Sequence, residues 1–261
     1  MAVTCVSLRD AQSAATATVA VGFGFNCFQF AVERAGKMVE ILWATEDFAT
    51  GQARPSGSGI PLLFPFPGRI ASGVLRWDAR EYHLPRGDGR GNAIHGFVLD
   101  RPWRLIEQTS DRVVGEFQAS VDDPSLLELW PADFRLRASY ELRGESLVCQ
   151  LDADNPDERM LPCGMGTHPY FRLPLGGSVA DICQVKLPIS EEWELADMIP
   201  TGRRSPVDAA SRMQQGMPYS ELRLDNAFTG LTPPGGPHLA KLYDPETKLT
   251  VEQIWDGVFR E

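Results

Sequence analysis

Residues 134–152, FRLRASYELRGESLVCQLD, carry the clearest β-strand pattern in the chain. Phe134, Leu136 and Ala138 alternate with polar residues at a period of two, the period at which successive side chains of a strand point to opposite faces. A turn signal centred on Gly144 divides the stretch. We therefore expect two successive strands, over residues 134–142 and 146–152.

Strand-like segments continue on both sides of this stretch, separated by turn signals about ten residues apart, a spacing that favours a β-sandwich. The remaining candidates are residues 14–21, 23–32, 38–43, 103–107, 112–119, 185–187 and 191–195, with hairpins over 75–84 and 241–253. Only residues 206–216 suggest a short irregular or helical insertion. No repeat or linker divides the 261 residues, so we expect one all-β domain, a large antiparallel β-sandwich spanning residues 1–261.

The composition limits the classes of partner. A hydrophobic content of 43% with 23% charged residues is typical of a globular protein, and a net charge of −10 argues against nucleic acid or an anionic membrane as a general partner. No segment resembles a signal peptide or a membrane span. Five scattered cysteines indicate neither a disulfide framework nor a zinc site. We expect a cytoplasmic protein without metal or cofactor, and its oligomeric state stays open.

The segment GMGTHPYFRL, residues 164–173, places His168 between two glycines and a proline followed by aromatic residues. Glycine permits close backbone approaches, and Pro169 biases the histidine toward an extended conformation. An imidazole that titrates near neutrality beside flat apolar rings suits a small polar ligand with a hydrophobic face, such as a sugar. The alternative is a strand-end histidine that satisfies a hydrogen bond in the core.

Three further residues are candidates for the same site. His95 lies beside Gly96, as His168 lies beside glycine, whereas His83 reads as an ordinary strand residue. Arg69 is the only charge in residues 57–70, GSGIPLLFPFPGRI, where its planar guanidinium could hold hydroxyls or a carboxylate, or could pair with a structural acid. Asp225, in LRLDNAFTGL, could accept hydrogen bonds from sugar hydroxyls or form a turn with Asn226.

Taken together, the blocks GIPLLFPFPGRI, AIHGF, GTHPYFRL and LDNAF, in this order, resemble the aldose 1-epimerase family, also called galactose mutarotases. The resemblance extends from about residue 15 to the end of the chain. It implies a supersandwich of mainly antiparallel strands that binds a sugar on an open concave face. It also implies that the activity is interconversion of the α and β anomers of a free aldohexose.

This reaction needs a proton delivered to the ring oxygen and another removed from the C1 hydroxyl, each transfer being worth on the order of 10² to 10⁴ in rate. By resemblance, His168 is the acid, His95 assists by hydrogen bonding, and Arg69 and Asp225 hold hydroxyls. The family's base is a glutamate in a glutamate-proline segment beyond a segment similar to residues 251–261, and the sequence has no such motif. We therefore expect the base, and one or two C-terminal strands, to be missing.

Three explanations of this departure stay open: a chain cut short, a protein that binds sugar with little turnover, or a substitute carboxylate, for which Glu252 and Glu261 are candidates by position. The substrate is open as well. Seven arginines and no lysine lie between Arg69 and Arg104, a pattern that could indicate a phosphate-reading rim, as in hexose-6-phosphate 1-epimerases, or strand faces paired with acids.

A carbohydrate-binding protein on the same scaffold, and a purely structural sandwich, are the alternatives from other classes. Neither a serine or cysteine nucleophile motif nor a strong pair of acids accompanies the histidines, so a hydrolase is not indicated. A small-molecule sugar is the expected partner.

Overall fold

The computed structural model describes residues 3–259 and consists of strands joined by loops and short helices. This confirms the predicted all-β, antiparallel sandwich. The chain divides into two compact units, Met1–Phe171 and Arg172–Glu261. The expectation of a single domain over residues 1–261 stays a prediction.

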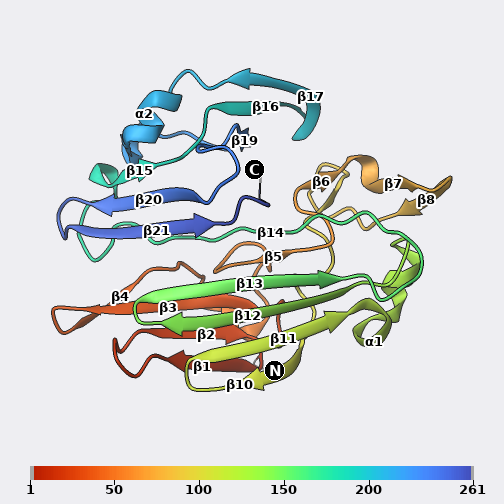
Figure 1. The fold of residues 1–261 in the computed structure, drawn as a ribbon, viewed down its shortest axis with the longest axis horizontal. Coiled ribbons are helices and arrows are strands. Elements are labelled where there is room, and N and C mark those ends of the chain that lie inside the picture. The colour runs from red at the N-terminus through yellow and green to blue at the C-terminus, as the bar shows by residue number, and fades with distance from the viewer. Residues whose placement is uncertain (1–2, 260–261) are drawn as a thin grey trace. The chain divides into compact units, whose positions relative to one another are not determined.

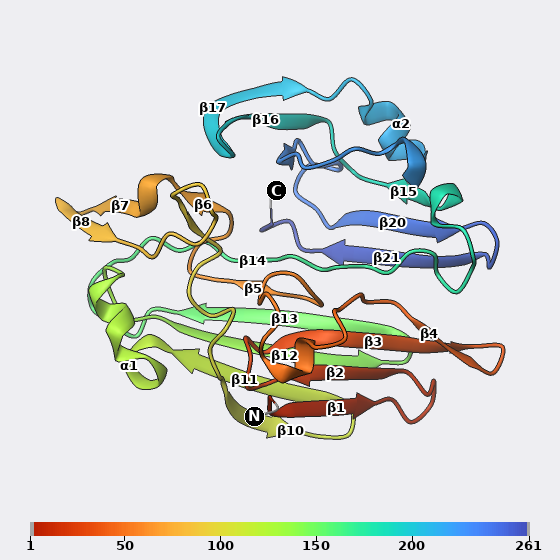
Figure 2. The same cartoon turned by 180° about the vertical axis from the view of Figure 1, so that it is seen from behind.

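Two four-stranded antiparallel sheets form the body of the N-terminal unit, and they lie as stacked layers in Figures 1 and 2. The first sheet contains β1 (Cys5–Arg9), β2 (Thr16–Ala20), β3 (Asn26–Arg34) and β4 (Lys37–Glu40). The second contains β10 (Arg104–Gln108), β11 (Arg112–Gln118), β12 (Arg135–Arg143) and β13 (Ser146–Asp154). In both sheets the strands follow chain order, so each strand pairs with the next one along the chain.

Apolar and polar residues alternate along β12, and one face of the strand is buried as predicted. Leu136, Ala138, Tyr140 and Leu142 are all buried, whereas the intervening side chains are exposed or partly exposed. Burying one face of a strand while solvating the other fixes its register, because a slip of one residue would exchange the two faces. β12 and β13 pair from Arg135 opposite Asp154 to Arg143 opposite Ser146, close to the predicted bounds.

The predicted strand over residues 23–32 was wrong at its start, because β3 begins only at Asn26. Phe25 has a positive φ of 50°, which a strand does not allow, and its ring crosses between the two sheets. It stacks on Trp103 and Tyr140, with ring centroids at 5.2 and 5.8 Å. A Cβ on Gly115 would lie 2.4 Å from the Phe25 ring, so the glycine makes room for it. The aromatic residue serves packing between sheets rather than strand formation.

Shorter elements of the N-terminal unit connect the sheets and carry several of the candidate residues. The two-residue strands β5 (Leu62–Leu63) and β14 (Gly166–Thr167) pair with each other, as do β6 (Arg69–Ile70) and β9 (Ala93–Ile94). β7 (Val74–Trp77) and β8 (Arg80–His83) form the predicted hairpin. The helical turns are η1 (Phe48–Thr50), η2 (Ala71–Gly73), α1 (Ala119–Asp122) and η3 (Pro124–Glu128).

The C-terminal unit contains a four-stranded sheet in the order β18-β15-β20-β21 and a three-stranded sheet in the order β17-β16-β19. Its strands are β15 (Gln184–Lys186), β16 (Glu191–Ala196), β17 (Ile199–Pro206), β18 (Met217–Pro218), β19 (Phe228–Thr229), β20 (His238–Asp244) and β21 (Leu249–Trp255). The predicted insertion contains α2 (Ala210–Gln215), and η4 (Ala180–Ile182) and η5 (Tyr219–Glu221) are single turns. Ile189, Met213 and Met217 form a buried cluster. No helix within residues 3–259 has the length and apolarity to cross a bilayer.

Candidate functional site

The loop of residues 57–70 is held in place by Asn26, a buried side chain at the start of β3. The Asn26 amide donates to the carbonyl of Ser58 at 2.8 Å and accepts from the backbone N–H of Ile60 at 2.8 Å. A buried amide with both ends satisfied is costly to displace. Gly59 lies against this amide, where a Cβ would be 2.2 Å from Asn26 Oδ1. The sequence therefore fixes the path of the loop from inside the core.

His168 follows β14 and is attached to the near end of the same loop. Its backbone N–H donates to the carbonyl of Pro61 at 3.1 Å, and that of Tyr170 donates to the carbonyl of Gly59 at 2.8 Å. The carbonyl of Tyr170 in turn accepts from the N–H of Trp43 at 2.8 Å. The backbone of the segment is thus bonded on both sides, and the His168 side chain is exposed.

His95 is attached to the far end of the loop through the β6–β9 pair. Its N–H donates to the carbonyl of Gly68 at 2.9 Å, and its φ of 65° is unusual for a residue with a side chain. The next residues are fixed too, since Phe97 N–H donates to the carbonyl of Phe64 at 2.8 Å. Backbone strain of this kind persists only where the surroundings impose it, and it is concentrated at functional sites.

Aromatic packing anchors these segments to the core of the N-terminal unit. Phe66 stacks on Trp130 with ring centroids at 5.5 Å, and Phe97 meets the same indole edge-on at 5.6 Å. Phe64 packs edge-on against Phe134 at 5.3 Å. The apolar residues that surround Arg69 and His95 in sequence therefore act as anchors that hold the polar residues in place.

Four rings form a continuous row in the N-terminal unit. The centroids of His95 and His168 are 6.3 Å apart, those of His168 and Tyr170 are 4.9 Å apart, and those of Tyr170 and Trp43 are 6.2 Å apart. Trp43 is 39% exposed, which is unusual for an indole whose backbone is fixed by hydrogen bonds. The row combines two imidazole rings with aromatic surface.

The surroundings of His95 keep its imidazole neutral. Burial, followed by the positive charges of His168, Arg69 and Arg54, lowers the pKa of His95 from 6.5 to about 4. Its Nδ1 atom is buried and has no hydrogen-bond partner among the residues that the structure describes. At neutral pH this histidine can therefore donate or accept one hydrogen bond without carrying charge.

Of the two roles weighed for Arg69, the structure shows the pairing with a structural acid. Its Nε donates to Asp88 Oδ2 at 3.1 Å, and this carboxylate also accepts from the backbone N–H groups of Arg90 and Asn92 and from the Asn92 amide. Burial of Asp88 raises the pKa of its carboxyl, but these hydrogen bonds outweigh burial and hold the pKa well below its usual range. The Nη groups of Arg69 donate to no other described residue, so a ligand can use them.

The other candidate residues belong to the C-terminal unit. The Asp225 side chain is exposed in the loop before β19, and the backbone N–H of Asp225 donates to Asn226 Oδ1 at 3.2 Å. No cation among the described residues pairs with the Asp225 carboxylate. Glu252, on β21, pairs with Lys241 at 2.5 Å. Glu261 lies outside the described residues. The structure thus brings His95, His168 and Arg69 together within the N-terminal unit. Asp225 belongs to the C-terminal unit.

Two residues of the site were missed by the sequence analysis. Arg54 acts electrostatically on His95, and Trp43 ends the row of rings. Arg54 lies in a polar turn without any motif, so no local signal distinguished it from a surface arginine. Trp43 was assigned to a strand over residues 38–43, but β4 ends at Glu40, and the indole belongs to the segment that bonds to Tyr170.

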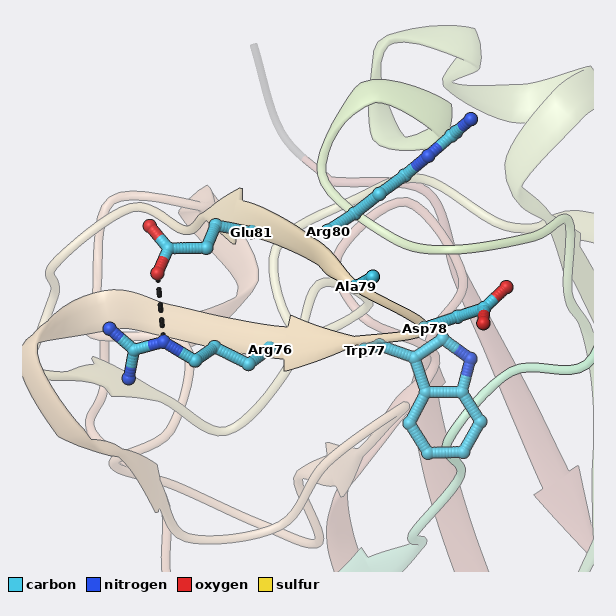
Figure 3. Close-up of a pocket in the computed structure, with 6 residues that line it drawn as sticks. All are labelled: Arg76, Trp77, Asp78, Ala79, Arg80 and Glu81. Atoms are coloured by element: carbon cyan, nitrogen blue, oxygen red, sulfur yellow. Dashed lines mark hydrogen bonds and ion pairs between the residues drawn. The ribbon is translucent and has the colours of Figure 1, made fainter.

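A separate hollow of about 310 Å³ lies at the tip of the β7–β8 hairpin, lined by Arg76, Trp77, Asp78, Ala79, Arg80 and Glu81 (Figure 3). Arg76 is bonded to Glu81, as the dashed line in Figure 3 shows. Trp77 donates to the carbonyl of Met160. None of the four predicted site residues lines this hollow.

Several of the arginines between Arg69 and Arg104 are paired with acids. Besides Arg69 and Arg76, Arg101 pairs with Asp123 and Arg104 with Asp122 and Glu116. Within residues 3–259 no cluster of three or more histidines, cysteines or carboxylates could hold a metal ion.

Comparison with known proteins gives these features a context. The chain is 30% identical to rat galactose mutarotase over 146 residues, which is 55% of this chain and 41% of that protein. It is 31% identical to the Escherichia coli protein YihR over 112 residues, covering 42% of this chain and 35% of the relative. These alignments thus span less than half the length of either curated relative.

The fold resembles that of a galactose mutarotase-like protein from Clostridium acetobutylicum, with a TM-score of 0.83 and 21% identity over 99% of this chain and 82% of that one. A family model for aldose 1-epimerases matches residues 13–253. The resemblance suggested by the four sequence blocks is therefore confirmed: the chain belongs to the aldose 1-epimerase family.

Proposed function

We propose that this protein interconverts the α and β anomers of an aldohexose by acid-base opening and reclosure of the sugar ring at C1. The observation that carries the proposal is the contact between His95 and His168, at 6.3 Å between ring centroids, in a chain of the aldose 1-epimerase family. Two imidazoles at this distance can both reach one pyranose. Their backbones are fixed before any ligand binds, which reduces the cost of ordering them.

In this proposal His168 delivers a proton to the ring oxygen. Its side chain is exposed to an incoming sugar, and its ring lies between His95 and Tyr170. Protonation of the ring oxygen weakens its bond to C1, and the ring opens to the aldehyde as the C1 hydroxyl gives its proton to a base, which returns it to the C1 oxygen on reclosure. Rotation about the C1–C2 bond and reclosure from the other face give the second anomer, and the proton returns to His168.

His95 plays a different part because its low pKa keeps it neutral. A neutral imidazole hydrogen-bonds to the sugar near the ring oxygen without competing for the transferred proton. The unengaged Nη groups of Arg69 hold hydroxyls, and the Asp225 carboxylate accepts hydroxyl hydrogens. Tyr170 and Trp43 supply apolar surface for the C–H face of the sugar.

Removal of the C1 hydroxyl proton requires an acceptor. Glu252, one of the two carboxylates suggested by position, already pairs with Lys241 on the neighbouring strand β20. A carboxylate held by an ammonium group must leave that partner before it can accept the C1 hydroxyl proton. Glu252 is therefore a poor candidate for the base. The described residues support the other proton transfer, from His168 to the ring oxygen.

The test is the decay of optical rotation after α-glucose or α-galactose is dissolved with and without protein. We expect faster equilibration with the protein, and a loss of about 10²-fold or more of the added rate in His168→Asn. His83→Asn is the matched control, since His83 is an exposed strand residue on β8. Saturable sugar binding without acceleration would instead support a carbohydrate-binding protein on the same fold.

A further inference from the structure

The local charge of the histidine site is opposite to that of the chain. The whole chain carries a net charge of −10, yet the charged groups that act on His95 are His168, Arg69 and Arg54, all of them cationic or able to become so. A site of positive potential in an acidic protein favours anionic ligands over neutral ones. The question is which of these cations is available to a ligand.

The two arginines differ in this respect. Arg69 is largely neutralised by the buried carboxylate of Asp88, whose side chain is fully enclosed. Arg54 pairs with no carboxylate among the residues that the structure describes. The one hydrogen bond of its side chain to these residues runs from Nε to the neutral hydroxyl of Ser56, at 3.1 Å. Both Nη groups of an exposed guanidinium are therefore left for a ligand.

The turn that carries Arg54 is fastened to the row of rings. The Tyr170 hydroxyl donates to the carbonyl of Ser56 at 2.9 Å, and the Tyr170 ring lies 4.9 Å from that of His168. Within the turn, Gly57 N–H donates to the carbonyl of Arg54 at 3.0 Å. Arg54 is thus not a randomly placed surface residue, because one hydrogen bond to Tyr170 and the contact between the rings of Tyr170 and His168 connect its turn to His168.

We infer that Arg54 binds an anionic substituent, a carboxylate or a phosphate, on the aldose whose anomeric centre lies at His95 and His168. This inference rests on the proposed function. A guanidinium offers two parallel donors to such an oxyanion, and it keeps its charge at all physiological pH values. This inference does not rest on the number of arginines between Arg69 and Arg104, because several of those arginines are already paired with acids.

The experiment is calorimetric binding of glucose, glucuronate and glucose 6-phosphate to the full chain, at low and at high salt. We expect at least one charged sugar to bind about tenfold more tightly than glucose, with the advantage falling as salt rises. The stronger of the two charged sugars identifies the substituent. In Arg54→Gln the advantage should disappear while glucose binding stays unchanged.

Arg80→Gln is the matched control, because Arg80 is an exposed arginine without an ion pair among the described residues and belongs to the hairpin of Figure 3. It should keep the advantage. Equal binding of charged and neutral sugars by the unmodified chain, or an advantage that survives in Arg54→Gln, overturns the inference. Either result leaves the proposed function standing, which depends on the rate of anomer exchange and not on this preference.

Discussion

Gly96 lies directly against the carbonyl of Phe64: a Cβ on this glycine would come within 2.0 Å of the carbonyl oxygen, and its φ is 77°. The two residues form a parallel bridge, and the N–H of Phe97 donates to the same carbonyl. This close approach holds the chain next to His95 on the loop of residues 57–70. This close approach explains why the residue next to His95 is a glycine.

The first prediction concerns this contact. Gly96→Ala should cost roughly 3 kcal/mol or more of unfolding free energy, because it adds a clash with main-chain atoms to the strain of a positive φ. Gly144→Ala is the control, since Gly144 also has a positive φ of 59° but no atom near its missing Cβ. It should cost only about 1 kcal/mol. Denaturant unfolding measures both, and equal costs would contradict the close approach.

The second prediction concerns pH. Because the pKa of His95 is lowered to about 4 in the folded state, the unfolded chain binds a proton near pH 6.5 that the folded chain does not. Stability should therefore fall as the pH drops from about 6.5 to about 4, and His95 should contribute no such dependence above this window. His95→Asn should lose less thermal stability across the same window. A titration of His95 near pH 6.5 by NMR would refute the assigned environment.

The third prediction concerns the exposed indole at the end of the ring row. Trp43→Ala should weaken sugar binding by about 1 kcal/mol, or roughly fivefold, because it removes apolar surface next to Tyr170. Trp77→Ala, in the hairpin hollow, should leave sugar affinity unchanged. Loss of sugar affinity in Trp77→Ala and not in Trp43→Ala would instead assign sugar binding to that hollow.

The fourth prediction concerns the base. Glu252→Gln should change the rate of anomer exchange by less than about threefold, since the carboxylate of Glu252 is engaged by Lys241. Lys241→Gln, which removes the partner charge and keeps the carboxylate, serves as the control. A rate loss near 10²-fold in Glu252→Gln alone would make this glutamate the base after all.

The strands were predictable where one face is buried and the other solvated, as in β12, because burial then imposes a period of two on the sequence. β17 was missed, since all eight of its residues are exposed or only partly buried and leave no such period. The start of β3 was misplaced because Phe25 looks like a strand residue and packs between sheets. A sequence does not distinguish these two uses of an aromatic side chain.

Within the site, His95, His168 and Arg69 could be found because glycines and prolines mark the segments that carry them. Arg54 could not, since its importance comes from the turn that Tyr170 fastens to the ring row, a contact between residues far apart in the chain. Pairing of Arg69 with a structural acid was one of two open alternatives, and only the folded loop shows that the acid is Asp88, which accepts from a single nitrogen of the guanidinium.

Both histidines are bonded through their main chains to opposite ends of one loop, His168 to Pro61 and His95 to Gly68. The gap between the two imidazoles is consequently a property of that loop's internal length and not of how the large sheets twist or slide. Inserting or deleting a single residue between Pro61 and Gly68 would change that spacing, and it would also move Phe64 and Phe66, whose buried rings pack on Phe134 and Trp130. The spacing of the two imidazoles and the packing of this part of the core are therefore set by the same eight residues, 61–68.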